Sequence, residues 1–312
     1  QLFLEHNDIA VAIIDVVMET DDAGLRLIET IRHEINNQST RIVLRTGQPG
    51  QAPERKIIRE YDISDYKNKT ELSGIKLDTL MCTTLRSYQN IISLQKNKKG
   101  LELVVESSSS LFDAATYESL VDKTMNYLSK LIKQCTHTPI YSLSALGIYC
   151  NCDEFQLLEA RGDFSHLADI DDIGKLPDSA SILISQSIEE QRNIYNANSI
   201  VLNMKSSSEK SVIFYFEGFS PLLEQDIALI DLFSNNTQTS FDNEELRHDL
   251  DEGQREIVYL LGEAIEHKSK ETGNHIRRVA ETSRILALEL GYSVVESEKI
   301  KSASPLHDLG KI

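Results

Sequence analysis

The chain has few cysteines, no long apolar run and no leader-like segment among its first residues. Four cysteines in 312 residues are too few and too scattered to staple a protein of this size, which predicts reduced thiols and a cytoplasmic location. No stretch approaches the roughly 18–20 apolar residues that cross a bilayer. The opening segment, QLFLEHNDIA, has neither the basic nor the apolar region of a signal peptide. The sequence therefore predicts a protein that is neither secreted nor embedded in a membrane.

Basic residues are also scarce. Lys and Arg number 32 against 49 Asp and Glu, so the formal net charge at pH 7 is -17. A general nucleic-acid or membrane-surface binder needs a basic face that releases counterions or meets anionic lipid. We therefore expect neither DNA nor a membrane as a partner, although a local cationic site could still bind an anion.

The length of 312 residues, with 40% hydrophobic and 26% charged residues, is typical of globular proteins. At roughly 100–200 residues per domain, this length predicts more than one hydrophobic core. The chain begins with Gln1 instead of Met and stops shortly after a His-Asp pair suited to holding metal. We therefore expect a fragment that is truncated at both ends.

Three patterns follow one another along the chain. Residues 1–95 alternate apolar runs with amphipathic helical stretches, which predicts a doubly wound α/β domain with a parallel sheet. Residues 96–220 combine helical stretches with strand-like segments of alternating faces, which predicts an antiparallel α+β domain with helices on one side of its sheet. Residues 221–254 predict a helical connector and residues 255–312 an all-α segment. The predicted fold class is therefore multi-domain.

The connector and the residues after it carry apolar side chains at helical spacing: Ile227, Ile230, Phe233, and later Ile257, Leu261 and Ile265. Between the two groups lies the polar segment FSNNTQTSFDNE, which predicts two helices with a break. Because such a stripe can pair with an identical stripe, a homodimer through the connector is expected.

Three polar residues end consecutive predicted strands of the first domain. Asp15 ends VAIID, Thr46 ends RIVLRT, and Lys69 comes just after ISDYK. Ligands bind at the carboxyl edge of an open parallel sheet. A carboxylate there can attack a phosphoryl group, while a hydroxyl and an ammonium take up the new negative charge. Each residue alone is more simply a turn, strand-end or surface residue, but the ordered set favours phosphoryl transfer.

Residues 9–95 resemble the later part of the receiver domain of two-component response regulators. The resemblance implies that Asp15 is the phospho-acceptor and that Thr46 and Lys69 are the phosphoryl-switch residues. It also implies Mg²⁺ held partly by the main-chain carbonyl of Val17, and a cognate histidine kinase as partner. Two features depart from the family: Thr70 stands where Pro is usual, and the first strand with its acidic pair is absent. We therefore expect this chain to be phosphorylated poorly or not at all.

A second set of polar residues lies near the other end. KETGNHIRRVAETS places His275 at the start of a helix, and PLHDLGK places His307 and Asp308 at the end of another. Antiparallel packing would bring these residues together, with Lys311 reaching inward. Such a set suits a divalent metal that activates water against a phosphodiester. A lone His at a helix end is more often a cap or a core residue, so the hypothesis depends on the whole set.

The segments TGNHIRRVAE and LHDLGKI resemble the HD superfamily and, within it, the HD-GYP subfamily that hydrolyses cyclic di-GMP. The resemblance implies that His275, His307 and Asp308 are metal ligands and that Lys311 is a catalytic phosphate contact. Glu271 matches the ligand of an extra metal, although KSKET is also an ordinary solvated charge run. The implied cofactor of the complete protein is a pair of divalent metal ions, Fe or Mn.

Together these features predict a response regulator whose receiver controls a cyclic di-GMP phosphodiesterase, with a sensor-like middle domain of the GAF or PAS kind. The fragment alone is expected to be inactive. Two alternatives stay open: a non-enzymatic signalling adaptor with a degenerate HD domain, and an HD hydrolase of another nucleotide. A Gly-Tyr-Pro segment with further histidines after Ile312 would favour the phosphodiesterase, and its absence the adaptor.

Overall fold

A computed structural model describes most of the chain, namely residues 2–6, 8–47, 58, 61–69, 74–114, 116–136, 142–151, 155–167, 172–205, 210–269, 275–307 and 309. The chain divides into two compact units. Unit 1 comprises Gln1–Val105, Lys130–His137 and Leu222–Leu229. Unit 2 comprises Glu106–Ser129, Thr138–Pro221 and Ile230–Ile312.

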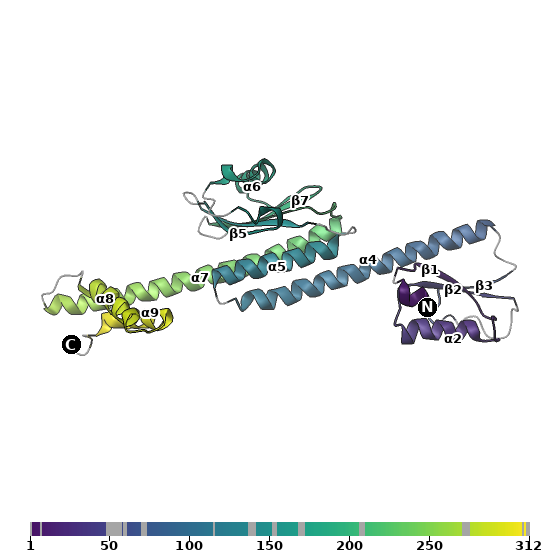
Figure 1. The fold of residues 1–312 in the computed structure, drawn as a ribbon, viewed down its shortest axis with the longest axis horizontal. Helices are drawn as coiled ribbons and strands as arrows, with labels where there is room; N and C mark the ends of the chain where they lie inside the picture. Colours follow the sequence, from purple (N-terminus) through teal and green to yellow (C-terminus); the bar gives the residue numbers. More distant parts are fainter. Residues whose placement is uncertain are drawn as a thin grey trace. The chain divides into compact units, whose positions relative to one another are not determined.

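Unit 1 contains a three-stranded parallel sheet in the order β1-β2-β3 (Figure 1). Its strands are β1 (Val11–Asp15), β2 (Arg41–Thr46) and β3 (Asp65–Asn68). A short helix, α1 (Leu2–Glu5), precedes them. Both strand pairs run parallel, as the continuous apolar runs predicted.

Helix α2 (Ala23–Glu29) continues into the π-helical turn η1 (Thr30–Glu34) and covers one face of this sheet. The packing involves Ile28 and Ile31, both fully buried, against apolar residues of the first two strands, namely Ile14, Ile42 and Leu44. Burial of each such side chain contributes about 1.5–3 kcal/mol. A well-packed apolar core therefore supports the first two strands of the sheet, β1 and β2.

Helix α4 (Gly74–Phe112) runs without interruption across residue 95, where the sequence pattern placed the end of the first domain. Helix α5 (Tyr117–Cys135) follows it. The amphipathic sequence of α5 explains its helical form, because buried residues recur at three- and four-residue spacing: Leu120, Val121, Thr124, Met125, Leu128, Leu131, Ile132 and Cys135.

Unit 2 contains a five-stranded antiparallel sheet in the order β5-β4-β8-β7-β6. The sequence pattern predicted four of its strands, and these are β4 (Ser144–Cys150), β5 (Phe155–Arg161), β7 (Ser199–Lys205) and β8 (Ser211–Glu217). It missed the two-residue edge strand β6 (Ile194–Tyr195), which is too short to show an alternating pattern.

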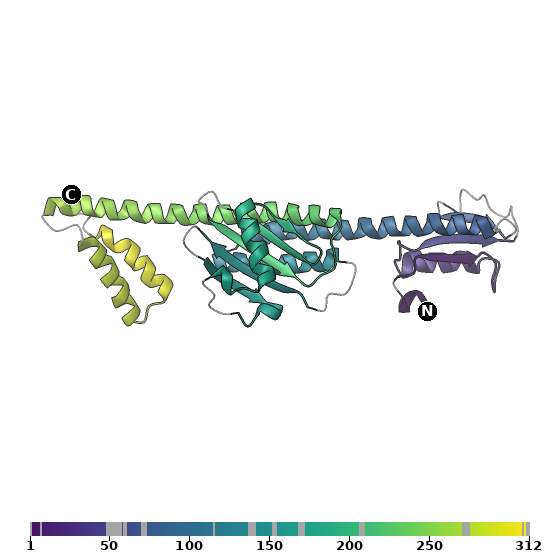
Figure 2. The same cartoon turned by 90° about the horizontal axis from the view of Figure 1, so that it is seen from above.

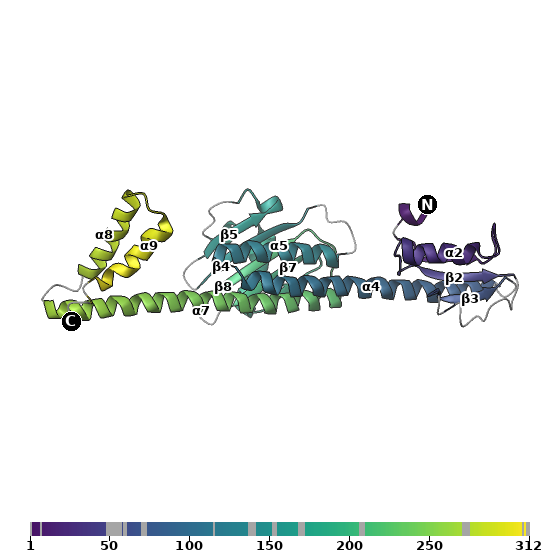
Figure 3. The same cartoon turned by 90° about the horizontal axis from the view of Figure 1, so that it is seen from below.

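Helices pack on both faces of this sheet, and the prediction of helices on one side is wrong. Helix α6 (Asp178–Glu190) covers one face, with Ala180 and Ile184 in the same apolar cluster as Leu146 and Tyr215. Figure 2 shows α6 lying across the strands, and Figure 3 shows α5 and helix α7 (Glu224–Ser269) across the opposite face. Because the central strands β4 and β8 are buried almost throughout, both of their faces need a covering layer.

Helix α7 (Glu224–Ser269) is continuous, so the predicted break within FSNNTQTSFDNE is wrong. Phe233, Thr237 and Phe241 follow one another at four-residue spacing and are all buried. Two polar residues of this segment are held by neighbours: Asn236 donates to Ser108 Oγ at 3.1 Å, and Gln238 donates to the carbonyl oxygen of Lys205 at 2.7 Å. Tertiary packing therefore overrides the poor helix propensity of Ser, Thr and Asn.

The last elements are α8 (His275–Glu289), α9 (Val294–Ala303) and the 3₁₀ turn η4 (Ser304–Leu306). Gly291, at φ +86°, ends α8 as predicted. A capping box between Ser293 and Glu296 begins α9. The two helices are tied by an ion pair of 2.6 Å between Lys301 Nζ and Glu281 Oε2.

Cysteine pairing and membrane spans can be examined within the described residues. Cys82, Cys135 and Cys150 are free thiols, while Cys152 lies outside the described residues. None of the described helices combines the length and the apolar character needed to cross a bilayer.

Candidate functional site

Asp15, Thr46 and Lys69 lie together at the carboxyl edge of the three-stranded sheet. Asp15 ends β1, Thr46 ends β2, and Lys69 follows β3. The Nζ atom of Lys69 lies 3.0 Å from Asp15 Oδ2, and its main-chain N–H donates to the carbonyl oxygen of Thr46 at 2.8 Å. Thr46 is buried. The arrangement places a carboxylate, a hydroxyl and an ammonium at one edge, which is what phosphoryl transfer to Asp15 needs.

Sequence reasoning missed a fourth member of this site, Arg45. Its Nε and Nη2 atoms donate to the two carboxylate oxygens of Asp15, at 2.5 Å and 3.1 Å. The parallel register pairs Asp15 directly with Arg45. The predicted parallel pairing could have indicated Arg45. If the two strands end at the same edge of the sheet, the residue before Thr46 lies beside the end of β1.

The two cations stabilise the ionised form of Asp15. Hydrogen bonds from Arg45, and then from Lys69, lower the pKa of Asp15 from 3.8 to about 2. The carboxylate is therefore ionised at neutral pH, the form that can act as a nucleophile. Both of its oxygens are engaged, so accepting a phosphoryl group requires these contacts to rearrange.

The described residues do not form a complete Mg²⁺ site. Val17 follows Asp15 by two residues, and together they offer one carboxylate and one carbonyl. Among the described residues no group of three or more His, Cys, Asp or Glu side chains could hold a metal ion. Mg²⁺ keeps several waters and is usually bound through one or two carboxylates, so Asp15 and the carbonyl of Val17 would supply only part of its coordination. Thr70, which departs from the receiver pattern, lies outside the described residues.

The second candidate site contains two histidines. His275 begins α8 and His307 follows η4, and their ring centroids lie 6.4 Å apart with an interplanar angle of 63°. The Nδ1 atom of His307 lies 2.9 Å from the carbonyl oxygen of Ser304. Because a carbonyl oxygen can only accept, Nδ1 is the donor in this contact, which orients the imidazole ring. This is how metal-binding histidines are commonly oriented.

Two imidazoles suit a borderline divalent metal, so the described part of this site fits the implied cofactor. Asp308, Lys311 and Glu271 lie outside the described residues. The proximity of His275 and His307 agrees with the predicted packing of their helices. The roles of all five residues stay predictions.

Gly262 of α7 packs against residues close in sequence to both histidines. A Cβ atom added to Gly262 would lie 2.6 Å from Ile276 Cδ1 and 2.8 Å from the carbonyl oxygen of Pro305. Ile276 follows His275, and Pro305 lies two residues before His307; both are buried. The close approach of α7 therefore holds the ends of both segments, and no sequence motif indicated it.

We expect Gly262→Ala to destabilise the chain by about 1–3 kcal/mol, because the new methyl group meets a main-chain atom that cannot move freely. Gly253→Ala on the same helix is the matched control, since nothing lies within 4 Å of its Cβ position. That change should stabilise the helix by about 0.5–1 kcal/mol. Urea unfolding of both variants measures the difference. Equal effects of the two changes would contradict the packing role of Gly262.

Comparison with known proteins finds that the chain is similar to two phosphodiesterases of cyclic dinucleotides. It is 34% identical over 321 residues to the 3'3'-cGAMP-specific phosphodiesterase 2 of Vibrio cholerae serotype O1, an alignment that covers 100% of this chain and 60% of that protein. It is 35% identical over 65 residues to the cyclic di-GMP phosphodiesterase response regulator RpfG of Xanthomonas campestris pv. campestris, covering 21% of this chain and 17% of that protein.

Residues 81–250 match the family described as Domain of unknown function (DUF3369), and the chain belongs to this family. The match contains the five-stranded sheet and its flanking helices α5 and α6. The chain spans about 60% of the length of the Vibrio relative.

Proposed function

We propose that this chain is part of a response regulator whose output is a metal-dependent phosphodiesterase for cyclic dinucleotides. The observation that carries the proposal is the pair His275 and His307, which two separate segments bring to a ring distance of 6.4 Å. The relation to a phosphodiesterase along the whole chain supports it. Residues 1–95 are the proposed receiver and residues 255–312 the start of the proposed HD-GYP domain.

In this proposal the histidines bind the metal and other residues contact the substrate. A bound divalent metal pair supplies an activated water and polarises the phosphoryl oxygen. His275, His307 and Asp308 are the proposed ligands, with Glu271 as a weaker candidate. Lys311 is the proposed contact to a phosphate oxygen. At the receiver, Asp15 accepts the phosphoryl group from a histidine kinase, and Thr46 and Lys69 respond to its charge.

The substrate is proposed to be cyclic di-GMP, with 3'3'-cGAMP as a second candidate. The resemblance of the His motifs favours the first, and the name of the relative that aligns with the whole chain favours the second. The test is hydrolysis of both compounds by a longer protein that contains this chain, loaded with Mn²⁺ or Fe²⁺. This chain alone is expected to bind the metal weakly and to hydrolyse neither compound. If the longer protein binds metal and spares both compounds, the adaptor or other-nucleotide alternative replaces this one.

We also propose that a second copy pairs with α7. Its exposed apolar residues recur at the four- and three-residue spacing of a coiled coil: Leu246, Leu250, Ile257 and Leu260, with Gly253 at the intervening position. A dimer of the chain in solution would bury this stripe.

We expect Leu250→Glu to convert a dimer into a monomer, because two carboxylates would face each other in the seam. Leu290→Glu is the control, since Leu290 is also exposed but lies outside α7. Sedimentation equilibrium distinguishes the two states. A monomeric wild-type chain, or a dimer that survives Leu250→Glu, would remove α7 from this role.

A further inference from the structure

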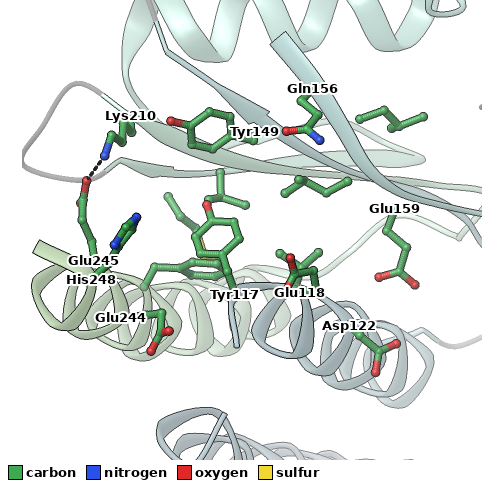
Figure 4. Close-up of a pocket in the computed structure, with 16 residues that line it drawn as sticks. Tyr117, Glu118, Asp122, Tyr149, Gln156, Glu159, Lys210, Glu244, Glu245 and His248 are labelled. Atoms are coloured by element: carbon green, nitrogen blue, oxygen red, sulfur yellow. Dashed lines mark ion pairs between the residues drawn. The ribbon is translucent and has the colours of Figure 1, made fainter. Parts of the chain in front are cut away.

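A cavity of about 680 Å³ lies between the five-stranded sheet and helices α5 and α7 (Figure 4). Small-molecule sites typically occupy about 300–1,000 Å³. All of its lining residues fall within the DUF3369 match, and none belongs to the two candidate sites above. The cavity is therefore a separate candidate site within the middle of the chain.

The cavity has an apolar and aromatic interior. Val121, Val212 and Phe241 line it and are buried. Figure 4 shows Tyr117 projecting from α5 into the space beneath the sheet. Its ring centroid lies 6.4 Å from that of Tyr149 and 5.5 Å from that of Phe241, in edge-on contacts. Electron-rich aromatic faces of this kind attract cations.

The hydroxyl group of Tyr117 also lacks a hydrogen-bonding partner among the described residues. Burial raises the pKa of Tyr117, so its hydroxyl stays protonated. Tyr117 is half-buried, and a polar group of a bound ligand can form a hydrogen bond with its hydroxyl.

The charged residues that line the cavity are mostly acidic: Glu118, Asp122, Glu159, Glu244 and Glu245 against Lys210, with His248 beside them. Lys210 is paired with Glu245 at 3.0 Å. Arg161 bridges Asp122 and Glu159, at 2.8 Å and 2.6 Å, and Arg247 pairs with Glu244 at 3.0 Å. Five carboxylates and three cations leave two negative charges in excess. Among the described residues Glu118, next to Tyr117, has no ion-pair partner.

We propose that this cavity binds a small organic amine as a cation. Its ammonium group lies at the Glu118 carboxylate and the Tyr117 hydroxyl, and its apolar body packs over Val121 and Phe241. Excess negative charge attracts this ligand and repels an anion, so a nucleotide is a poor occupant. The acidic residues bind the ammonium group of such a molecule, and the aromatic interior contacts its apolar part.

An amine in the cavity contacts α7 directly, through Phe241 and the acidic residues that follow it. The same helix reaches Ile276 and Pro305 through Gly262. The cavity is therefore placed to sense an amine and to act on the segment that carries the two histidines.

Tryptamine is a suitable probe, because the chain contains no tryptophan and indole fluorescence then reports the ligand alone. Fluorescence anisotropy with this chain should show tryptamine binding about tenfold or more tightly than its uncharged analogue tryptophol, and indole-3-propionate binding least, since only the amine gains a charged hydrogen bond. Glu118→Gln should weaken tryptamine binding about tenfold, and Tyr117→Phe should weaken it less. Glu256→Gln, an exposed carboxylate on α7 outside the cavity, should leave it unchanged.

The proposal is wrong if tryptamine does not bind, if tryptophol or the anion binds as tightly, or if Glu118→Gln has no effect. A loss of binding in Glu256→Gln equal to that in Glu118→Gln would also overturn it, because general charge attraction would then explain the result. Matching melting temperatures of the variants confirm that each is folded. The measurement needs no phosphodiesterase activity, so its outcome is independent of the proposed function.

Discussion

A His307→Ala variant of a longer, metal-loaded protein containing this chain is expected to lose at least about 100-fold in the turnover of cyclic dinucleotides, together with bound metal. The physical reason is the loss of one proposed imidazole ligand, whose ring is oriented by the contact between Nδ1 and the Ser304 carbonyl oxygen. His307 is exposed, so its truncation should change the free energy of unfolding by no more than about 0.5 kcal/mol.

His166→Ala is a closely matched control. The Nδ1 atom of His166 lies 2.7 Å from the carbonyl oxygen of Asp163, three residues earlier, which is the same local arrangement as at His307. It is also exposed, but it lies in the middle of the chain, outside the proposed metal site. Metal analysis and initial rates with cyclic di-GMP and 3'3'-cGAMP test both variants. Unchanged metal content in His307→Ala would exclude His307 as a ligand.

The second large effect is expected at Asp15. A protein extended at its N-terminus should be labelled by a small phosphodonor in Mg²⁺ buffer, and Asp15→Asn should abolish the label. The pKa of Asp15, about 2, means that the nucleophilic carboxylate is fully present at neutral pH. Because this pKa is depressed, the ion pairs stabilise the fold above the ordinary pKa of 3.8, and this contribution is lost as the pH falls through about 2.

Asp65→Asn provides the comparison for Asp15→Asn. Asp65 also pairs with a lysine, at 3.0 Å from Lys67 Nζ, but it begins β3 and therefore lies at the opposite end of that strand from Lys69. Its amide variant should keep the label. A label that persists in Asp15→Asn would remove Asp15 from the role of acceptor. The chain without an N-terminal extension should label weakly, because the acidic pair of a receiver is not among its residues.

The candidate sites could be predicted to different extents. The polar residues Asp15, Thr46 and Lys69 were found because each ends an apolar run, and His275 and His307 because each stands in a recognisable motif. Arg45 and Gly262 were missed. Arg45 matters through its partner on the neighbouring strand, which only the predicted parallel pairing could have indicated. Gly262 matters through the atoms that a side chain would meet, which no local sequence pattern records. The cavity was missed for the same reason, since it is lined by residues from α5, α7 and four strands.

Local pattern was sufficient for the parallel strands of unit 1, for four of the strands of unit 2 and for the end of α8 at Gly291, because hydrophobic period and glycine conformation act over a few residues. Only the folded chain decided that α7 is continuous through a segment of weak helix formers, because the burial of Phe233 and Phe241 outweighs the weak helix propensity of the Ser, Thr and Asn residues between them. It also decided that helices cover both faces of the antiparallel sheet. Contacts between residues far apart in sequence set these features, and no local period records them.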